Sequence, residues 1–394
     1  MDVLVLGGGI AGLMAAHYLA RAGFGVAVVD AGPRGGFETS KYNAGLLEER
    51  RSFTEIDPVR AAIGNLLGAD APVGASIGQL VSNAGWVIRA LRVDREGRGG
   101  LEERILRRSL ALWDELAREG HVSFYSRRGV RLYADPSRAE EVARETGGRA
   151  LDRREVEELG FRGFGGGVLD EGSRWVNPHE VLEGMRAALA EEGVRILRGE
   201  AALAAEEGGL VRAIGVEARA DSYVVAAGAW SDALCGRLGC RLGVLPARGV
   251  AVIAGYGSGS VGLPALMEEL GIALGLHGGS ALRITGYFEL AGYSPDVSSR
   301  ARRLLSRAGG RLAVGGLRPL EVGAGLRPCA HDQLPVVGAV PGRRNLYVAT
   351  GGCRRGMTVA PLMGDVLARI MSGAGIGEDE RRLGPERLLR RPGT

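Results

Sequence analysis

The chain has 394 residues, of which 45% are hydrophobic and 5% aromatic, and its formal net charge is +4. This length fits two domains or one large α/β unit with an inserted subdomain. So small a net charge gives no argument for nucleic-acid binding, and no apolar run is long enough for a membrane helix. Lys41 is the only lysine, so arginine supplies nearly all of the basic charge. Such a bias is typical of a GC-rich genome and also suits a thermophile.

The cysteines do not predict a metal site. Cys235, Cys240, Cys329 and Cys353 form no C-x-x-C pair and lack the spacing of metal ligands. Free thiols in a reducing cytoplasm are therefore expected. The N-terminus is apolar, but Asp2 stands where a signal peptide carries basic residues, and glycines interrupt the run. We expect a cytoplasmic protein, with peripheral attachment to the inner face of the membrane left open.

The first 30 residues predict a dinucleotide-binding unit. Gly7, Gly9 and Gly12 form a G-x-G-x-x-G motif directly after the apolar run 3–6 and at the start of a helical stretch over 10–21. The first glycine permits a tight turn, the second lets backbone N–H groups approach a pyrophosphate, and the third allows helix and strand to pack closely. The N-terminus of the helix then faces the phosphates with its positive dipole end.

An acidic residue follows at the position where a ribose is bound. Asp30 ends the second expected strand, 26–29, and its carboxylate can accept both hydroxyls of an adenosine ribose. An unphosphorylated ribose is therefore favoured, which fits FAD or NAD better than NADP. The residues expected to contact this half of the cofactor are Gly7, Gly9, Ile10, Ala11, Gly12, Asp30 and Ala31.

Periodicity and turn residues predict alternating elements along the rest of the chain. In chain order we expect a helix over 101–118, strands over 122–125 and 130–133, a helix from Asn177-Pro178 to about 192, short strands within 194–216, a buried strand over 222–226, a helix within 228–239, strands over 249–254 and 281–290, a helix near 297–308, a strand over 345–350 and a helix over 358–371.

Several strings resemble a known family. TSKYNAGLL at 39–47, VVAAGAWS at 224–231 and the block GAGLRPCAHDQLPVVG at 323–338 resemble FAD-dependent amine oxidoreductases of the D-amino-acid oxidase, glycine oxidase and sarcosine oxidase superfamily, and within it the bacterial D-amino-acid dehydrogenases. The segment 66–92 resembles the dehydrogenase branch less specifically. The similarity runs from residue 1 to about 373. It implies FAD, which we expect to be non-covalent because no cysteine or histidine stands where sarcosine oxidases attach their flavin.

The resemblance and the element order together predict an α/β fold. A Rossmann-type FAD-binding domain would be interleaved with a smaller α+β substrate-binding cap domain built on an antiparallel sheet. We assign 1–95, 140–243 and 320–380 to the FAD-binding domain. The cap would comprise 96–139 and 244–319, and 381–394 would form a polar, basic C-terminal tail.

The family's T-S-x-x-N-A-G loop is matched from Thr39 to Gly45, and it offers backbone donors and small side chains to the ribityl chain and the flavin ring. A turn at 351–357 leads into the last helix, whose N-terminus would aim N–H groups at the flavin N1/C2 carbonyl. Arg354 and Arg355 lie in this turn, and each is either a flavin contact or a surface residue. The predicted flavin contacts are Ser40, Asn43, Ala44, Gly45, Leu46, Ala202, Ala227, Gly228, Gly351, Gly352, Arg354, Gly356, Met357 and Thr358.

Arg327, in G-L-R-P, corresponds to an arginine that grips the substrate carboxylate in related enzymes; the alternative is an internal ion pair. Tyr256 and Tyr287 lie in expected cap strands, where relatives place a tyrosine over the substrate, although packing roles are equally open. Cys329 and Cys353 fall in loops expected beside the flavin. They are expected to be unreactive thiols, with pairing as the alternative.

The implied reaction is the dehydrogenation of a D-amino acid or a proline-like cyclic amine. A hydride would pass from the α-carbon to flavin N5, and the electrons would go to a quinone or an artificial dye. One alternative is an oxygen-using oxidase of the glycine or sarcosine oxidase type. Another is a flavin-carrying subunit of a hetero-oligomeric electron-transfer complex that is inactive alone. Homo- or hetero-oligomers are both compatible with the sequence, which does not determine the stereochemistry of the substrate.

Overall fold

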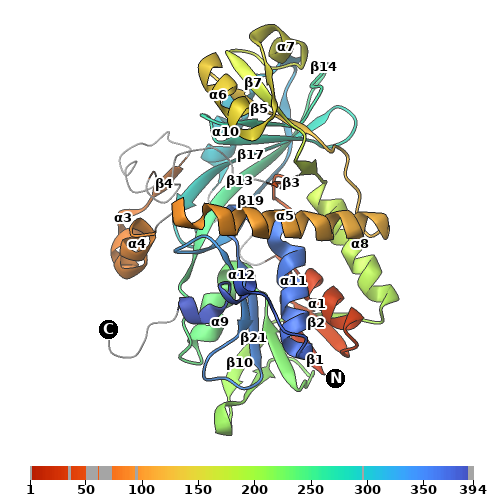
Figure 1. Ribbon diagram of the computed structural model, residues 1–394, viewed down its shortest axis with the longest axis vertical. Helices are drawn as coiled ribbons and strands as arrows, with labels where there is room; N and C mark the ends of the chain where they lie inside the picture. Colours follow the sequence, from red (N-terminus) through yellow and green to blue (C-terminus); the bar gives the residue numbers. More distant parts are fainter. Residues whose placement is uncertain are drawn as a thin grey trace.

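The computed structural model describes residues 2–33, 37–49, 61, 73–93, 96–294 and 297–388. Two sheets form two layers, one above the other in Figure 1, and the long helix α5 (Glu96–Arg118) runs across between them. The chain passes from the lower layer into the upper one and back more than once. The expected α/β fold with an interleaved cap is therefore confirmed.

The lower layer is a sheet whose strands are parallel apart from one edge strand. Its order is β20-β21-β12-β1-β2-β9, and only β20 is antiparallel to its neighbour. Val3 and Val5 face the helices on one side, whereas Leu4 and Leu6 face the opposite side, so β1 is apolar at every position because both faces are covered. The strands are β1 (Val3–Leu6), β2 (Val26–Asp30), β9 (Arg195–Arg198), β12 (Ser222–Val225), β20 (Pro335–Ala339) and β21 (Leu346–Gly351).

Helices cover one face of this sheet, and a small hairpin covers the other. The predicted apolar face of 101–118 is buried against α11, where Trp113 is fully buried. The helices are α1 (Ile10–Arg21), α5, α8 (Pro178–Glu191) and α11 (Gly356–Ser372). On the other side lie the hairpin β10 (Ala202–Ala205) and β11 (Val211–Ile214), a 3-10 turn at Glu207–Gly209, another at Gly228–Trp230, and α9 (Ser231–Gly236).

The upper layer is a mixed sheet whose long strands belong to the cap. Its order is β19-β13-β17-β16-β15-β5-β7-β6, and β4 also pairs with β17. Its own hydrophobic core lies beneath α10. The strands are β4 (Val73–Ala75), β5 (Gly129–Tyr133), β6 (Arg149–Leu151), β7 (Gly166–Asp170), β13 (Val244–Gly255), β15 (Ala265–Met267), β16 (Ile272–Leu276), β17 (Ala281–Leu290) and β19 (Arg318–Ala330).

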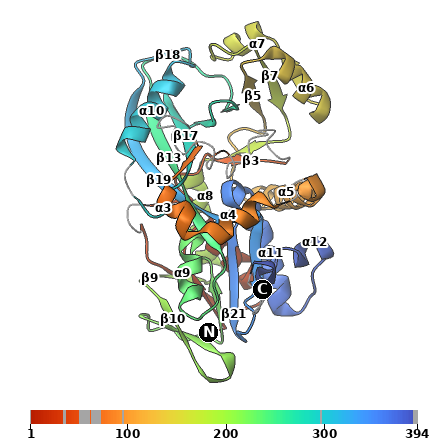
Figure 2. The ribbon, with the colours of Figure 1, turned by 90° about the vertical axis from the view of Figure 1, so that its left-hand side faces the viewer.

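Short elements complete the fold. Figure 2 shows α3 and α4 at the junction of the two layers. The helices are α3 (Ile77–Ser82), α4 (Ala84–Leu91), α6 (Pro136–Thr146), α7 (Arg153–Glu158), α10 (Ser298–Gly309) and α12 (Glu378–Arg381), with 3-10 turns at Cys353–Arg355 and Pro385–Arg387; the two-residue strands are β3 (Leu46–Leu47) with β8 (Arg174–Trp175), and β14 (Ser258–Gly259) with β18 (Val314–Gly315).

The predicted domain boundaries are wrong in several places, including β4, which pairs with cap strand β17 although 1–95 was assigned to the FAD-binding domain. The segments 149–170 and 320–330 belong to the cap sheet, although the sequence assigned them to the FAD-binding domain. Conversely, α5 packs on the lower layer rather than in the cap. The expected strand over 122–125 is also absent: Tyr125 donates its backbone N–H to the Trp175 carbonyl from a loop. Hydrophobic periodicity predicted the helix over 101–118 but no strand over 149–170 or 318–330, and strand pairing between distant segments decided which layer each element joined.

The end of the chain is not a surface tail as far as residue 388. Leu383 and Leu388 are buried, and the Leu383 carbonyl accepts the backbone N–H of Val337 at 3.0 Å. Arg387 Nε donates to Asp332 Oδ2 at 2.8 Å. The predicted tail 381–394 is therefore wrong over 381–388, because two leucines in this basic stretch find apolar positions against the lower sheet.

We expect Arg387→Met to destabilise the fold by about 3 kcal/mol near pH 7, because it leaves the Asp332 carboxylate buried without its cation. Burial raises the pKa of Asp332, but the Arg387 guanidinium outweighs it and holds the pKa below its ordinary value. Such an acid stabilises the fold above its unfolded pKa and loses that contribution as the pH falls toward the folded value. The difference in the free energy of unfolding between Arg387→Met and wild type should therefore shrink below about pH 4.

Urea unfolding between pH 7 and pH 3 measures this difference. Arg382→Met is the matched control, since Arg382 is an exposed arginine of the same segment. It should change the free energy of unfolding by less than about 0.5 kcal/mol. Equal losses in the two variants would contradict a specific role for the Asp332–Arg387 pair.

Candidate active site

A cavity of about 450 Å³ extends from the β1–α1 turn to the inner face of the cap sheet. Its walls come from both layers: the β1–α1 turn, the loop 38–46, the end of β12, the turn before α11, and cap strands β13, β17 and β19. These segments are distant in sequence. The crossovers between the layers bring them to one place.

The predicted glycine motif forms one end of the cavity. Gly7 has φ +121°, and a Cβ there would lie 2.5 Å from the Ala226 carbonyl oxygen. A Cβ on Gly12 would lie 1.8 Å from the Gly7 carbonyl oxygen, so only glycine allows α1 to approach β1 this closely. Gly9 is the extended N-cap of α1 and provides no side-chain cap. The N-terminal turn of this helix, at Gly9–Ala11, lines the cavity, as a phosphate site requires.

The acid and the neighbouring loop stand where the sequence predicted. Asp30 lines the cavity at the end of β2 and accepts the Gly32 backbone N–H at 3.2 Å. Ser40 Oγ accepts the Ile10 backbone N–H at 3.0 Å, which ties the loop 38–46 to the start of α1. A Cβ on Gly45 would lie 2.0 Å from the Val176 carbonyl oxygen, so this glycine serves close packing of the loop rather than the cavity wall.

The turn before α11 differs slightly from the prediction. The helix begins at Gly356, two residues earlier than expected, after a 3-10 turn at Cys353–Arg355. Thr358 is buried, and its carbonyl accepts N–H from Trp113 at 3.0 Å and O–H from Ser109 at 2.6 Å. Thr358 therefore joins α11 to α5.

Most predicted cofactor contacts line the cavity, and five of them do not. Those that line it are Gly7, Gly9, Ile10, Ala11, Asp30, Ala31, Ser40, Asn43, Ala44, Leu46, Ala227, Gly228, Gly351, Arg354, Gly356 and Met357. Those that do not are Gly12, Gly45, Ala202, Gly352 and Thr358.

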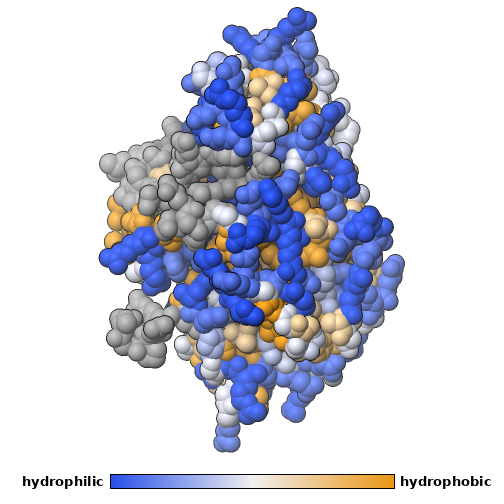
Figure 3. Space-filling view, in the orientation of Figure 1, coloured by the Kyte–Doolittle hydropathy of each residue, from blue (hydrophilic) through white to orange (hydrophobic). Residues whose placement is uncertain are grey.

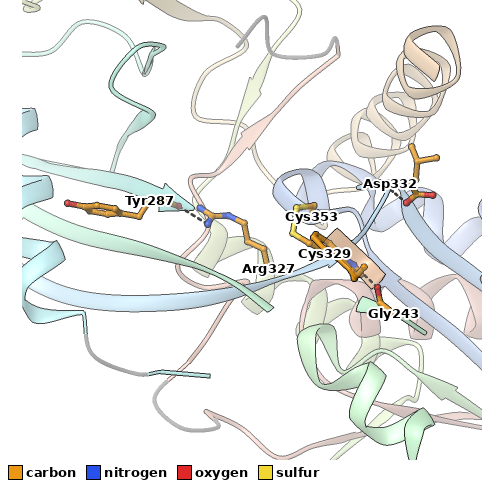
Figure 4. The surroundings of a disulfide bond; sticks show 8 residues. Gly243, Tyr287, Arg327, Cys329, Asp332 and Cys353 are labelled. Atoms are coloured by element: carbon orange, nitrogen blue, oxygen red, sulfur yellow. Dashed lines mark hydrogen bonds between the residues drawn. A yellow bond between two sulfur atoms is a disulfide. The ribbon is translucent and has the colours of Figure 1, made fainter. Parts of the chain in front are cut away.

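Arg327 projects into the cavity from β19. Its Nη1 donates to the carbonyl oxygen of Tyr287 at 2.9 Å (Figure 4). Within the described part of the chain no carboxylate pairs with it, so the internal ion pair that the sequence left open is not found there. A Cβ on Gly249 would lie 2.4 Å from Nη1, so the guanidinium occupies space that only a glycine leaves. Burial, and secondarily the charge of Arg354, lower the pKa of Arg327 to about 10.

Neither predicted tyrosine places its ring beside Arg327. Figure 4 shows the ring of Tyr287 extending away from the guanidinium, and this ring packs in the cap core. Tyr287 has φ +65°, and its contribution toward Arg327 is its backbone carbonyl. Tyr256 packs against the cap core and does not line the cavity.

Cys329 and Cys353 form a disulfide, so the expectation of free thiols is wrong for this pair. The sulfur atoms are 2.04 Å apart, and the bond joins β19 to the turn before α11 (Figure 4). Arg327 lies two residues before Cys329, and Arg354 directly follows Cys353. The disulfide therefore fixes the two arginine-bearing segments to each other across the layers. Cys235 and Cys240 remain free, as expected.

Arg354 and Arg355 have different roles. Arg355 forms ion pairs with Glu48 (3.5 Å) and Glu102. Arg354 lines the cavity and has a large accessible surface, yet burial and the nearby Arg355 lower its pKa. The large accessible surface and the lowered pKa of Arg354 are both explained if its side chain faces the enclosed space of the cavity.

Sequence reasoning missed a buried group of charges at the cap end. Glu268 lines the cavity, and Arg131 Nη1 donates to its Oε1 at 3.0 Å. Arg131 also pairs with Asp170 at 3.0 Å and with Glu48 at 3.5 Å. Burial, together with the charge of Glu48, raises the pKa of Glu268 despite Arg131. No local motif marks these residues, because each comes from a different part of the chain.

Comparisons with known proteins agree with this geometry. The family model described as DAO, FAD dependent oxidoreductase, matches residues 2–370. A D-amino acid dehydrogenase from Methylobacterium sp. (strain 4-46) is 31% identical, with 95% of this chain and 96% of that relative covered. Another from Paramagnetospirillum magneticum is 30% identical, with 95% of each covered.

Solved structures share the fold. Glycine oxidase from Geobacillus kaustophilus superposes with a TM-score of 0.73 at 22% identity, covering 100% of this chain and 99% of that one. L-proline dehydrogenase from P. horikoshii gives 0.68 at 18% identity, covering 98% and 97%. The glycine motif, the acid after β2 and the cavity between the layers fit an FAD molecule. The chain belongs to the DAO family of FAD-dependent oxidoreductases.

Proposed function

We propose that this enzyme dehydrogenates a D-amino acid by non-covalently bound FAD and passes the electrons to a quinone. The observation that carries the proposal is Arg327, a partly buried guanidinium that lines the cavity and has no acidic partner among the described residues. A partly buried cation of this kind is stabilised by an anion that arrives with a ligand. The carboxylate of an amino acid supplies that anion and matches the planar fork of the guanidinium.

Each end of the cofactor has its own set of residues in this proposal. The N-terminus of α1 would bind the pyrophosphate, and Asp30 would bind the ribose hydroxyls. The N-terminus of α11 and Arg354 would stabilise negative charge at the pyrimidine end of the ring. When bound, FAD supplies the two-electron acceptor for the reaction.

The protein itself contributes position and electrostatics. Arg327 would hold the carboxylate, the Tyr287 carbonyl fixes the orientation of the guanidinium, and Gly249 leaves room for it. The amino group must be uncharged when the α-hydrogen leaves as a hydride, so no dedicated base is needed if the neutral amine binds. The cap sheet excludes water from this end of the cavity.

The D-amino acid is proposed because relatives of about 30% identity over nearly the whole chain carry that name. Glycine oxidase and L-proline dehydrogenase share the fold at 22% and 18% identity, which leaves the choice of side chain and of a cyclic amine to experiment.

A quinone acceptor is supported by an apolar surface beside the cavity. Ile77 is 63% exposed and Val81 72% exposed on α3, and Ile88 is 48% exposed on α4. Figure 3 shows hydrophobic atoms at the left edge, where Figure 1 places these helices. Val73, the first residue of β4, which precedes α3 in the chain, lines the cavity. No helix in the described ranges is long and apolar enough to cross a bilayer, so contact with a membrane would be peripheral.

Arg327→Met should lower kcat/KM for the best D-amino acid by roughly 30- to several-thousand-fold, which corresponds to about 2–5 kcal/mol for a desolvated charge pair. Arg327→Lys should recover only part of this loss, because an ammonium cannot form two parallel bonds. FAD content should stay normal in both variants. Steady-state kinetics with a dye acceptor and the flavin absorbance give the two measurements.

Gly249→Ala tests the same assignment without changing charge. Its Cβ would meet the Arg327 guanidinium, so kcat/KM should fall at least about tenfold while FAD stays bound. Gly257→Ala is the control, since its Cβ would meet only the Gly315 carbonyl oxygen, at 3.8 Å. Nearly unchanged kcat/KM in Arg327→Met would refute the carboxylate role.

A second prediction concerns the acceptor. A short-chain quinone or dye should reoxidise the substrate-reduced flavin at least about tenfold faster than air-saturated buffer, measured by stopped-flow absorbance.

Val81→Asp should weaken turnover with a long-chain quinone in vesicles and leave turnover with a soluble dye unchanged. Stoichiometric peroxide at the rate of amine oxidation would identify an oxidase. A purified chain that no amino acid reduces would indicate a subunit that is inactive alone.

A further inference from the structure

Three side chains with metal-binding chemistry meet far from the active-site cavity. His17 lies on α1, His121 follows the end of α5, and Glu192 ends α8. One ligand atom from each lies within 4.8 Å of the other two. His17 stands eight residues after Gly9, which is about 12 Å along the helix from the end that faces the cavity. The group therefore belongs to neither the cofactor nor the substrate site.

His17 is an anomaly as a purely structural residue. It is fully buried, and neither ring nitrogen has a hydrogen-bond partner in the described part of the chain. Its Nδ1 lies 2.7 Å from Glu192 Oε1, which is an ion pair only if the ring is protonated, and Nε2 has no polar partner among the described residues. Glu192 Oε2 is also buried without a partner there. Buried polar atoms of this kind require an explanation, and an ion is one of the few available.

The donor atoms of the three side chains lie close enough together to serve one cation after small side-chain adjustments. The His17 and His121 rings also meet edge to face, with centroids 5.4 Å apart. Two imidazole nitrogens and one carboxylate oxygen form a donor set that Zn²⁺ and similar divalent transition metals prefer.

The backbone holds His121 in place against both neighbouring helices. The backbone N–H of His121 donates to the Leu116 carbonyl at 3.0 Å. A Cβ on Gly184 of α8 would lie 2.2 Å from the carbonyl oxygen of His121. Glu119 Oε2 lies 3.5 Å from His121 Nε2, and Arg21 holds Glu119 at 2.7 Å. A carboxylate beside a ligating histidine orients the ring and raises its basicity. The side chains of His121 and Glu192 are 22% and 21% exposed, which gives an ion a route from solvent.

We propose that His17, His121 and Glu192 bind one divalent transition-metal ion, with Zn²⁺ as the representative, and that this ion clamps α1, the end of α5 and α8 together. The site is structural. It holds in place the helix whose N-terminus faces the cavity, but it takes no part in the redox reaction.

The test uses the FAD-loaded full-length enzyme, treated with a chelator, dialysed and titrated with ZnCl₂ by calorimetry. We expect one Zn²⁺ per chain and a melting temperature that rises by several degrees on saturation. Mg²⁺ should give neither effect, because it prefers an all-oxygen site. His121→Ala should weaken Zn²⁺ binding at least tenfold and abolish the rise in melting temperature.

His179→Ala is the matched control, because His179 is an exposed histidine at the opposite end of α8. It should bind Zn²⁺ like wild type. If His121→Ala does not fold, Glu192→Gln replaces it, since this change keeps the shape of a partly exposed side chain. Zn²⁺ binding that is absent in wild type, or equal in wild type and the folded ligand variant, would overturn the proposal and leave only a His17–Glu192 ion pair.

Discussion

The site depends on a partly buried cation, Arg327, that has no anionic partner among the residues the structure describes. Moving a guanidinium out of water is costly, and the protein recovers part of that cost through one hydrogen bond from Arg327 to the Tyr287 carbonyl. Burial lowers the pKa of Arg327 to about 10, still well above neutral pH, so the group stays charged. The missing stabilisation is what a ligand carboxylate provides. A fold that supplied an internal carboxylate here would be more stable and would bind an anionic ligand less well.

Neighbouring features keep this arginine where it is. Gly249 leaves the space that the guanidinium fills, and the unusual backbone of Tyr287 turns its carbonyl toward Arg327. The disulfide between Cys329 and Cys353 joins the strand that carries Arg327 to the turn that carries Arg354. Two like charges, of which Arg354 lowers the pKa of Arg327, therefore remain on one cavity wall. A flexible connection would let them separate and lose the concentrated positive charge.

The two layers depend on each other through α5. This helix buries Trp113 in the lower core and crosses between the layers, and its Glu102 pairs with Arg355 beside the cavity. Its end also leads to His121 and the three-helix junction. One helix therefore connects the cofactor end, the charged cap end and the proposed metal site. Packing of this kind resists deformation, so the geometry at one end constrains the other.

The sequence determined the parts whose physics is local. The glycine motif was recognisable because only glycine fits at Gly7 and Gly12, and Asp30 follows at a fixed spacing. The apolar stripe of 101–118 was recognisable by its period, and the buried strands were recognisable as short apolar runs bounded by turn residues. Arg327 was found through a short motif, which conveys residue type and context but not the direction of the side chain.

Tertiary structure decided everything that needs two distant segments. Residues 149–170 joined the cap because β7 pairs with β5, and Leu388 docked on the lower sheet because an apolar position was open there. Cys329 and Cys353 are 24 residues apart, and spacing alone cannot show that β19 and the turn before α11 meet. Glu268 and His17 acquired their partners in the same way. Hydrophobic pattern specifies which face of an element is buried, but not which other element buries it.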